Sequence, residues 1–523
     1  MIATAAIFAC RITGMIREMV YMALFGDKGV LDAFYTAFRI PNLLRDLFAE
    51  GALSQSYTSV ATKTKSTEGD EATWELTQKI ATQLSSLMLV IITLGICFAG
   101  PIMQLLYGSD LGEPQHSDYD FMGLAVGLNQ IMWPFIGFAS LSALIMGALN
   151  MFGKFGLPML ASAAFNITSV LIGLGLGYYM DPNFGPQALY GFAIGVTLGG
   201  IAQMAVQLPA LRKTGFRWKL NFHWKGAEVR RIWALMIPSV VASGVTQFNV
   251  FINTGFALDL QEGSVVALTG AFRIWQLPVG LFGVATGMVV LPTIAKLIAE
   301  KKQSTIAEQV AGAMKLVAFF AIPSVVVLGV LGTEIISLAY QRGQFNENAS
   351  AYMGQVLSAY SIGLIGYAGT KVVQPVLLAL EKKWVPLIVA AISLSISLSL
   401  NYYFVYVLHK DASWLALTTS VVTTFTFLFY FFYLRNHLGS IGGKDLCISL
   451  TKVVVASLGM AVIYYFGKLW FMQDFVYQGF FYRLFLFGSV VTVGGIVYLG
   501  LSWIFKTPEL MMAVDKVLKR ARR

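Results

Sequence analysis

Charged residues are scarce in this sequence. Asp, Glu, Lys and Arg make up only 12% of the 523 residues, whereas roughly a quarter is usual for a soluble domain. Hydrophobic residues account for 57%, the mean hydropathy is +0.69, and apolar runs of about 20 residues or longer recur along the chain. The shortage of charge excludes an ordinary soluble enzyme and predicts an all-α polytopic membrane protein.

Cysteine and histidine are also rare, which removes several kinds of site. Cys10, Cys97 and Cys447 lie far apart, so no disulfide framework is indicated. The four histidines show no metal-ligand spacing, and the chain has neither a Walker A sequence nor an HExxH motif. We therefore expect no catalytic residue, no metal site and no bound cofactor.

The positive charges gather in alternate loops. The net charge is +10, and Lys and Arg dominate the loops that follow an even number of predicted spans, whereas the opposite loops carry acidic residues such as Asp181 and Asp259. The positive-inside rule then places both termini in the cytoplasm, and the charge gives no reason to expect a nucleic acid. Topology control and attraction to anionic lipid explain the basic tail; a specific partner is the alternative.

The apolar runs predict about fourteen membrane-spanning helices. The first run contains Arg11, Arg17 and Glu18, so it is interpreted as a retained helix and not as a signal peptide. The second span is expected at 31–62 and the third at 80–106.

An internal repeat organises these spans. Residues 37–40 and 271–274 both read AFRI, and further identities follow at the same offset. The repeat predicts two pseudo-symmetric six-helix lobes around a central cationic cavity, plus two C-terminal helices, although chance similarity between hydrophobic helices is the alternative. The expected divisions are an N-terminal lobe (1–211), a basic cytoplasmic linker (212–231), a C-terminal lobe (232–437), two extra helices (446–506) and a basic tail (507–523).

Ionisable residues concentrate in the first two helices, where each costs about 2.5–3.5 kcal/mol at membrane depth. Such residues are expected to face a cavity, a partner or a ligand. A guanidinium is always charged, and its planar donors fit phosphate oxygens, so the cavity favours a substrate that bears a phosphate or diphosphate. The alternative is that the arginines reach an interface or pair with acidic neighbours to hold helices together. The candidate substrate-binding residues are Arg11, Arg17, Arg39, Arg45 and Arg273, and the candidate acidic or gating residues are Glu18, Asp32 and Glu50.

A proline lies in the middle of the second helix. Pro41 removes an intrahelical hydrogen bond, and Asn42 is expected to satisfy the freed backbone group. We therefore expect a broken second helix that acts as a hinge, with Gly51 allowing a kink or close packing. An ordinary kinked helix is the alternative.

The same stretch resembles a known family. The runs are RxxGxxRE at 11–18, DAF at 32–34, FRIPNLLR at 38–45 and FAEGAxSQ at 48–55, with further matches INT at 252–254, LP at 291–292 and YSIGLIG at 360–366. These motifs are similar to those of the MurJ (MviN) lipid II flippases, within the multidrug/oligosaccharidyl-lipid/polysaccharide exporter superfamily. The resemblance covers essentially the whole chain.

The resemblance implies a transporter of the bacterial cytoplasmic membrane and not an enzyme. The implied substrate is lipid II, the undecaprenyl-diphosphate-linked peptidoglycan precursor, which alternating access moves from the inner to the outer leaflet for cell wall synthesis. The two extra helices would form a groove for the polyprenyl tail. Membrane lipids are further partners, the protein is expected to be a monomer, and cell wall synthesis and division machinery are candidate partners. The five arginines match basic cavity positions of the family, and Asp32 and Glu50 match acidic ones.

The sequence departs from the family at some positions. Phe272 and Gln276 replace acidic residues that often flank the arginine of the eighth helix, and Asp46 replaces a basic residue. Val405 follows Asn401 by four residues, so a sodium site of the kind found in some members is not expected, and coupling to a monovalent cation or to the membrane potential is left open. The alternatives are an exporter of another lipid-linked oligosaccharide or of drugs, and a membrane enzyme that acts on polyprenyl diphosphates.

Overall fold

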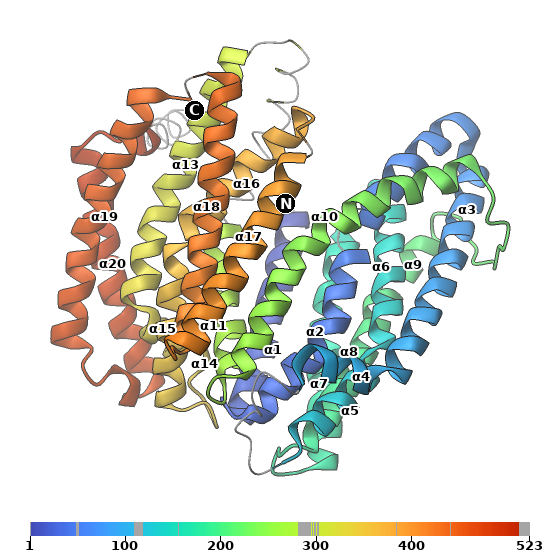
Figure 1. The fold of residues 1–523 in the computed structure, drawn as a ribbon, viewed down its shortest axis with the longest axis horizontal. Helices are drawn as coiled ribbons and strands as arrows, with labels where there is room; N and C mark the ends of the chain where they lie inside the picture. The colour runs from blue at the N-terminus through green and yellow to red at the C-terminus, as the bar shows by residue number, and fades with distance from the viewer. Residues whose placement is uncertain are drawn as a thin grey trace. The chain divides into compact units, whose positions relative to one another are not determined.

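The structure is a computed structural model that describes residues 2–48, 52–108, 119–154, 156–280, 294, 297, 300, 303–382, 384–439 and 441–511. Helices make up nearly all of this described part, and no strand occurs in it (Figure 1). The all-α fold predicted from the hydropathy is therefore confirmed. The chain forms two compact units, which are described separately. Unit 1 comprises Met1–Val265 with Arg342–Gln344, and unit 2 comprises Val266–Gln341 with Phe345–Arg523.

Unit 1 is a bundle of helices in which α7 packs closely on α8, α1 on α7, α3 on α6 and α2 on α5. Small residues allow the closest approach: a Cβ added to Gly191 of α8 would lie only 2.4 Å from the backbone nitrogen of Gly177 in α7. The helices of this unit are α1 (Ile2–Phe25), α2 (Gly29–Phe48), α3 (Ala52–Cys97), α4 (Ala99–Tyr107), α5 (Phe121–Met132), α6 (Pro134–Met151), α7 (Gly156–Met180), α8 (Ala188–Ala205), α9 (Leu208–Arg212) and α10 (Ala227–Leu258).

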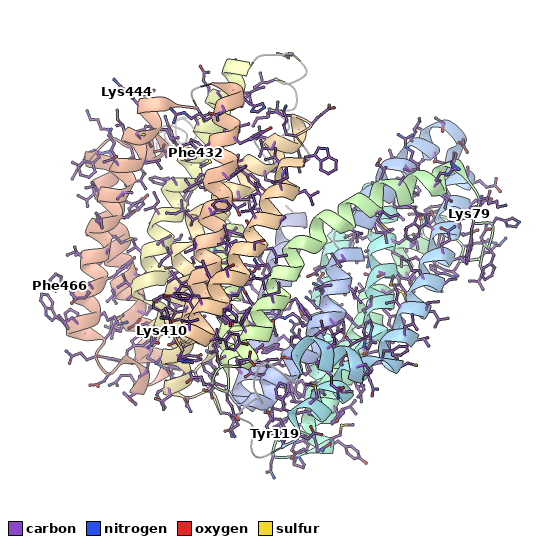
Figure 2. The ribbon with its side chains drawn as sticks, in the orientation of Figure 1. Lys79, Tyr119, Lys410, Phe432, Lys444 and Phe466 are labelled. Carbon is purple, nitrogen blue, oxygen red and sulfur yellow. The ribbon has the colours of Figure 1, made fainter. Side chains whose placement is uncertain are left out.

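Unit 2 follows from α11 (Ser264–Pro278), whose first two residues still belong to unit 1. In it α13 packs on α19 and α16, α18 on α15 and α16, and α19 on α20. Large apolar side chains such as Phe432 and Phe466 are exposed on its surface, as expected for contact with lipid (Figure 2). The remaining elements are α13 (Gln303–Val330), α14 (Gly332–Tyr340), α15 (Glu347–Ile362), α16 (Leu364–Ala379), α17 (Trp384–Tyr402), the π-helix η2 (Tyr403–Val407), α18 (Ala412–Leu438), α19 (Gly443–Phe471), the short η3 (Phe475–Tyr477) and α20 (Phe480–Ile504).

The long element α3 is a helical hairpin. Tyr57 and Thr77 are 20 residues apart, which is about 30 Å along a straight helix, yet their hydroxyl oxygens lie 2.6 Å apart. The chain reverses at Gly69, whose φ of 88° and ψ of −173° interrupt the helix. The segment between the second and third predicted spans is therefore helical where the sequence indicated a loop.

The number of spans is tested only in part. Among the described residues, nine helices are long and apolar enough to cross a membrane, or ten if the bent pair α15 and α16 is one span. Neither α1 nor α2 is among them, because ionisable residues interrupt the apolar sequence of both. The total of about fourteen stays a prediction.

The packing units do not follow the predicted lobe boundaries. The repeat placed the division in the linker at 212–231, whereas α10 packs on α2 and α3 and so belongs to unit 1 by contact. The repeat predicts which spans correspond and in which direction they run, whereas the two units reflect only which helices are in contact. The contacts therefore do not test the predicted lobes, which stay a prediction.

Candidate functional site: arginines and buried acids on α1 and α2

Arg17 and Glu18 form a buried ion pair on α1. Arg17 is 7% exposed and Glu18 is fully buried, and Arg17 Nη2 lies 3.0 Å from Glu18 Oε1. The second carboxylate oxygen of Glu18 accepts a hydrogen bond from the hydroxyl of Tyr35 on α2. The guanidinium also lies 5.4 Å from the centre of the Phe165 ring and 5.9 Å from that of Tyr21. This arrangement compensates the charge of Arg17 and joins α1 to α2, as the pairing alternative expects.

Arg45, near the end of α2, pairs with its neighbour Asp46. Its Nη2 and Nε lie 2.6 Å and 3.1 Å from Asp46 Oδ1, and Asn42 Nδ2 donates to Asp46 Oδ2 at 3.4 Å. The side chain of Arg45 is 23% exposed, so solvent or a ligand can reach it.

The remaining arginines differ in exposure and in location. Arg11 on α1 is exposed, and Arg39 on α2 is partly exposed. Arg273 on α11 is also partly exposed, but it belongs to unit 2. The structure therefore brings four of the five candidate arginines onto α1 and α2, and a cavity shared with Arg273 stays a prediction.

Asp32 anchors the first turn of α2 to the turn before α11. Asp32 is 2% exposed, and its Oδ2 accepts a hydrogen bond of 2.7 Å from the backbone N–H of Gly263. Gly263 has a φ of +81°, and an added Cβ would lie 2.4 Å from the carbonyl oxygen of Asp27, so only glycine fits this turn. Within unit 1, Asp32 thus connects two segments. Glu50 and Gly51 lie outside the described residues.

Pro41 leaves α2 unbroken, because another helix satisfies the carbonyl that it frees. The carbonyl of Ala37 would accept the N–H of residue 41, which proline lacks. Asn129 of α5, which is fully buried, donates its Nδ2 to Ala37 O at 2.7 Å, while Trp133 Nε1 donates to Asn129 Oδ1 at 2.8 Å. The expectation that Asn42 satisfies this group is therefore wrong: the amide of Asn42 faces Asp46. A hinge motion at Pro41 stays a prediction.

Sequence reasoning missed Asn129. One signal was present, because Asn129 and its neighbour Gln130 are the only amides inside the apolar run FMGLAVGLNQIM. An amide at membrane depth needs a hydrogen-bond partner, although the sequence alone does not say which one.

Sequence reasoning also missed two sets of polar contacts to α14 and the residue after it in unit 2, one from α19 and one from α20. Lys468 Nζ of α19 lies 2.9 Å from Glu334 Oε1 of α14, which is 3% exposed. Arg483 of α20, 7% exposed, donates to Ser337 Oγ at 2.7 Å and to Gln341 Oε1 at 2.6 Å. These bonds hold the two C-terminal helices on α14 at one end.

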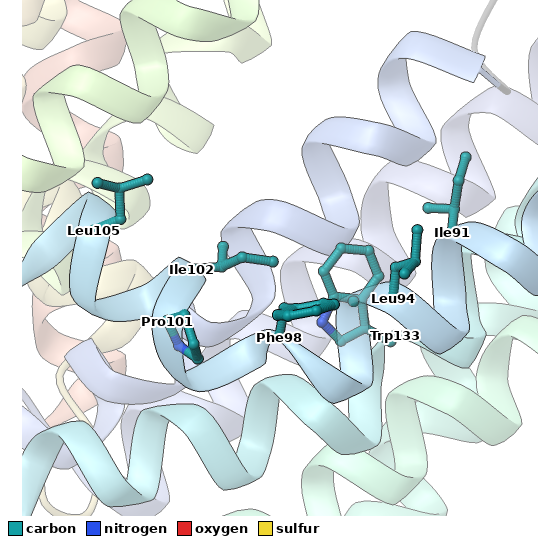
Figure 3. Close-up of a pocket in the computed structure, with 8 residues that line it drawn as sticks. Ile91, Leu94, Phe98, Pro101, Ile102, Leu105 and Trp133 are labelled. Carbon is teal, nitrogen blue, oxygen red and sulfur yellow. The ribbon is translucent and has the colours of Figure 1, made fainter.

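A pocket of about 510 Å³ in unit 1 is lined only by apolar residues of α3, α4 and the α5–α6 junction, including Leu94, Phe98 and Trp133 (Figure 3). The indole N–H of Trp133 already donates to Asn129. The pocket therefore offers no donor to a diphosphate and is separate from the arginine site.

Comparisons with known proteins agree on one family. The profile of the family described as lipid II flippase MurJ matches residues 22–486. The chain is 31% identical over 399 residues to the lipid II flippase MurJ of Burkholderia cenocepacia, covering 76% of this chain and 75% of the relative. It is 32% identical to the probable lipid II flippase MurJ of Bdellovibrio bacteriovorus, covering 74% and 72%.

Solved structures agree with this result. A lipid II flippase MurJ in an inward closed conformation matches with a TM-score of 0.77 and 26% identity, over 96% of this chain and 98% of that one. An inward-facing multidrug resistance MATE family transporter of the MOP superfamily matches with a TM-score of 0.68 and 12% identity, over 82% and 95%, which shows a shared fold. The chain belongs to the MurJ lipid II flippase family.

Proposed function

We propose that the protein moves lipid II from the inner to the outer leaflet of the bacterial cytoplasmic membrane, where cell wall synthesis uses it. The observation that carries this proposal is the family match across residues 22–486, together with the similarity to a solved MurJ over 96% of the chain. The protein is a transporter and not an enzyme, so no covalent bond changes. The headgroup crosses between the lobes by alternating access while the polyprenyl tail stays in lipid.

The arginines bind the diphosphate of the substrate. Arg39 and Arg45 are partly exposed on α2, and Arg11 is exposed on α1. A guanidinium presents parallel donors that match phosphate oxygens. Arg17 is already compensated by Glu18, so it contributes once the diphosphate competes with that carboxylate. Arg273 completes the set from unit 2.

Complementation of a flippase-depleted bacterium tests the proposal. The wild type is expected to restore growth, while Arg39→Ala, Arg45→Ala and Arg273→Ala fail although the protein reaches the membrane in normal amounts. Lysine variants rescue better than alanine variants, because the point charge survives while the planar fork is lost. The matched control is Arg212→Ala, which removes an exposed arginine of the linker and should rescue fully.

Two outcomes would count against different parts of the proposal. Full rescue by all three alanine variants refutes the arginine site but leaves the transport function. Failure of the wild type, with protein present in the membrane and lipid II still accessible only from the inner leaflet, refutes the function.

The surrounding arrangement follows from the same proposal. Both termini lie in the cytoplasm, and the protein acts as a monomer beside the cell wall synthesis and division machinery. Either a monovalent cation or the membrane potential drives the cycle. The potential alone supplies about 2.3 kcal/mol for each charge that crosses 100 mV.

A further inference from the structure

The linker before α10 contains an alternating segment. Residues 216–225 read FRWKLNFHWK, with an apolar or aromatic residue at every even position and a basic or polar residue at every odd position. The backbone of this stretch is neither helical nor turned, and α10 begins only at Ala227. In an extended chain, successive side chains point to opposite sides. Residues 216–225, here called the interfacial segment, alternate apolar with basic or polar side chains, and an extended backbone gives this pattern one apolar and one basic side.

The interfacial segment is fixed along α3. Gln78 Nε2 donates to the carbonyl of Arg217 at 2.8 Å, and the N–H of Asn221 donates to Thr82 Oγ1 at 2.9 Å. Gln83 Nε2 donates to the carbonyl of Trp224 at 3.3 Å. These bonds run in one direction along both chains, from residue 78 to 83 and from 217 to 224. Three hydrogen bonds therefore fix the segment to the surface of unit 1, beside the part of α3 where Figure 2 labels Lys79.

Only the first apolar residue of the segment is buried. Phe216 is 4% exposed and lies 5.2 Å from the ring of Trp74. The other four even positions are exposed, namely Trp218 (46%), Leu220 (68%), Phe222 (63%) and Trp224 (52%). A contiguous row of large apolar side chains marks a surface that contacts a partner or a membrane.

The charge around this row has one sign. Residues 212–231 hold seven Lys or Arg and only one acidic residue, Glu228. The basic residues of the segment, Arg217, Lys219 and Lys225, are exposed. The surface therefore complements a negatively charged one.

The position of the segment along α3 identifies that surface. The exposed apolar residues of α3 that face lipid begin at Leu89, six residues beyond Gln83 and so about 9 Å further along the axis. On the other side, α10 exposes Leu235 and Ile237 soon after Trp224. The segment thus lies where the exposed apolar stretches of α3 and α10 end, which is the level at which Trp residues gather in membranes.

We propose that the interfacial segment binds the anionic phospholipid surface. Trp218, Phe222 and Trp224 enter the boundary between headgroups and acyl chains, while the basic side chains contact lipid phosphates. This surface fixes the depth of α3 and α10 in the membrane, and it does so whatever cargo the protein carries.

A nitroxide scan of the full-length protein tests the proposal. Cys10, Cys97 and Cys447 are replaced by alanine, and a spin label is placed singly at positions 217 to 225 in vesicles of phosphatidylglycerol and phosphatidylcholine. We expect access to oxygen to dominate at 218, 220, 222 and 224, and access to a water-soluble nickel complex to dominate at the odd positions. Equal access to the nickel complex at all positions would overturn the proposal. Protection from both reagents would also overturn it, because a protein partner or another segment of the chain would then cover the row.

A charge variant tests the preference for anionic lipid. Arg217→Gln, Lys219→Gln and Lys225→Gln together should lower the preference for phosphatidylglycerol over phosphatidylcholine several-fold, measured with spin-labelled lipids bound to the protein. The matched control removes three exposed charges from unit 2, through Lys410→Gln, Arg435→Gln and Lys444→Gln. An equal loss in both variants would overturn the proposal, because net charge alone would then set the preference.

Discussion

Neighbouring carboxylates neutralise two of the arginine charges on α1 and α2. Arg17 pairs with Glu18 and Arg45 with Asp46, in each case an immediate neighbour in the sequence. Removing one member of a buried pair strands the other and typically costs about 3–5 kcal/mol. The pairs therefore lower the cost of keeping charged residues in the first two helices. They also mean that a ligand must compete with the paired carboxylate for each guanidinium.

Tyr35 is predicted to stabilise the fold through Glu18. Tyr35→Phe removes a donor to a fully buried carboxylate, so the free energy of unfolding should fall by about 1–3 kcal/mol. Thermal unfolding in detergent measures this change. Tyr179→Phe is the matched control, because Tyr179 is 85% exposed and should leave the transition temperature unchanged. Equal transition temperatures for the wild type and Tyr35→Phe would show that the hydrogen bond contributes nothing.

The sequence pointed to the ionisable residues of α1 and α2 but not to all of the side chains that form hydrogen bonds with them. Intramembrane arginines are recognisable because their cost is high, and the pairing of Arg17 with Glu18 was among the alternatives considered. Tyr35 was not identified, since whether a tyrosine on α2 meets an acid on α1 depends on the rotation of both helices. That rotation results from packing that the sequence of either helix does not reveal.

At the scale of the element, α2 keeps its shape with help from α5. Asn129 donates to the carbonyl that Pro41 frees, and we predict that the two residues are energetically coupled. Asn129→Leu leaves a buried carbonyl unsatisfied and should cost about 1–3 kcal/mol. In a Pro41→Ala background the N–H of residue 41 returns to Ala37, so the same change should cost less, and what remains includes the acceptor that the Trp133 indole loses in both backgrounds. A double-mutant cycle measured by unfolding in detergent gives the coupling energy, and simple additivity would contradict the prediction.

The hairpin in α3 rests on the backbone of one glycine. Gly69→Ala introduces a Cβ that meets nothing within 4 Å, so its effect comes only from a φ of +88° that alanine rarely adopts. We predict a loss of about 1–3 kcal/mol of stability. Gly175→Ala is the control, because Gly175 lies inside α7, also without neighbours within 4 Å, and alanine is the better helix former there. Equal effects of the two substitutions would exclude backbone strain at Gly69.

Hydropathy located most helices but not their ends or joints. Residues 63–79 are polar, so the sequence indicated a loop between two spans, whereas the chain is helical on both sides of Gly69. Helices of a membrane protein can extend beyond the apolar core, since polarity marks the edge of the bilayer and not the end of the hydrogen-bonded backbone. Ionisable residues inside the sequence, and not polar ends, make α1 and α2 fail a purely apolar test, although they are regular helices of 24 and 20 residues.

At the scale of the whole molecule, the orientation in the membrane is predicted from the charge of the loops alone. We predict that Ser66 and Asn436 face the cytoplasm, and that Asn183 and Gln473 face the other side. An odd number of predicted spans separates each successive pair of these positions. All four are exposed, so single cysteines placed there, with the three native cysteines changed to alanine, can react with a membrane-impermeant maleimide in spheroplasts.

Cysteines at 183 and 473 should be labelled at once, and those at 66 and 436 only after the membrane is opened. The physical reason is the bias of Lys and Arg toward the loops around 63, 212 and 435, which resists transfer across the membrane during insertion. The opposite pattern at all four positions would place both termini outside. A pattern that fails to alternate along the chain would mean that one unit contains a different number of spans. The repeat requires an even number of spans between its copies to preserve their direction, so a failure to alternate between 66 and 183, which lie between the copies, would also count against two parallel lobes.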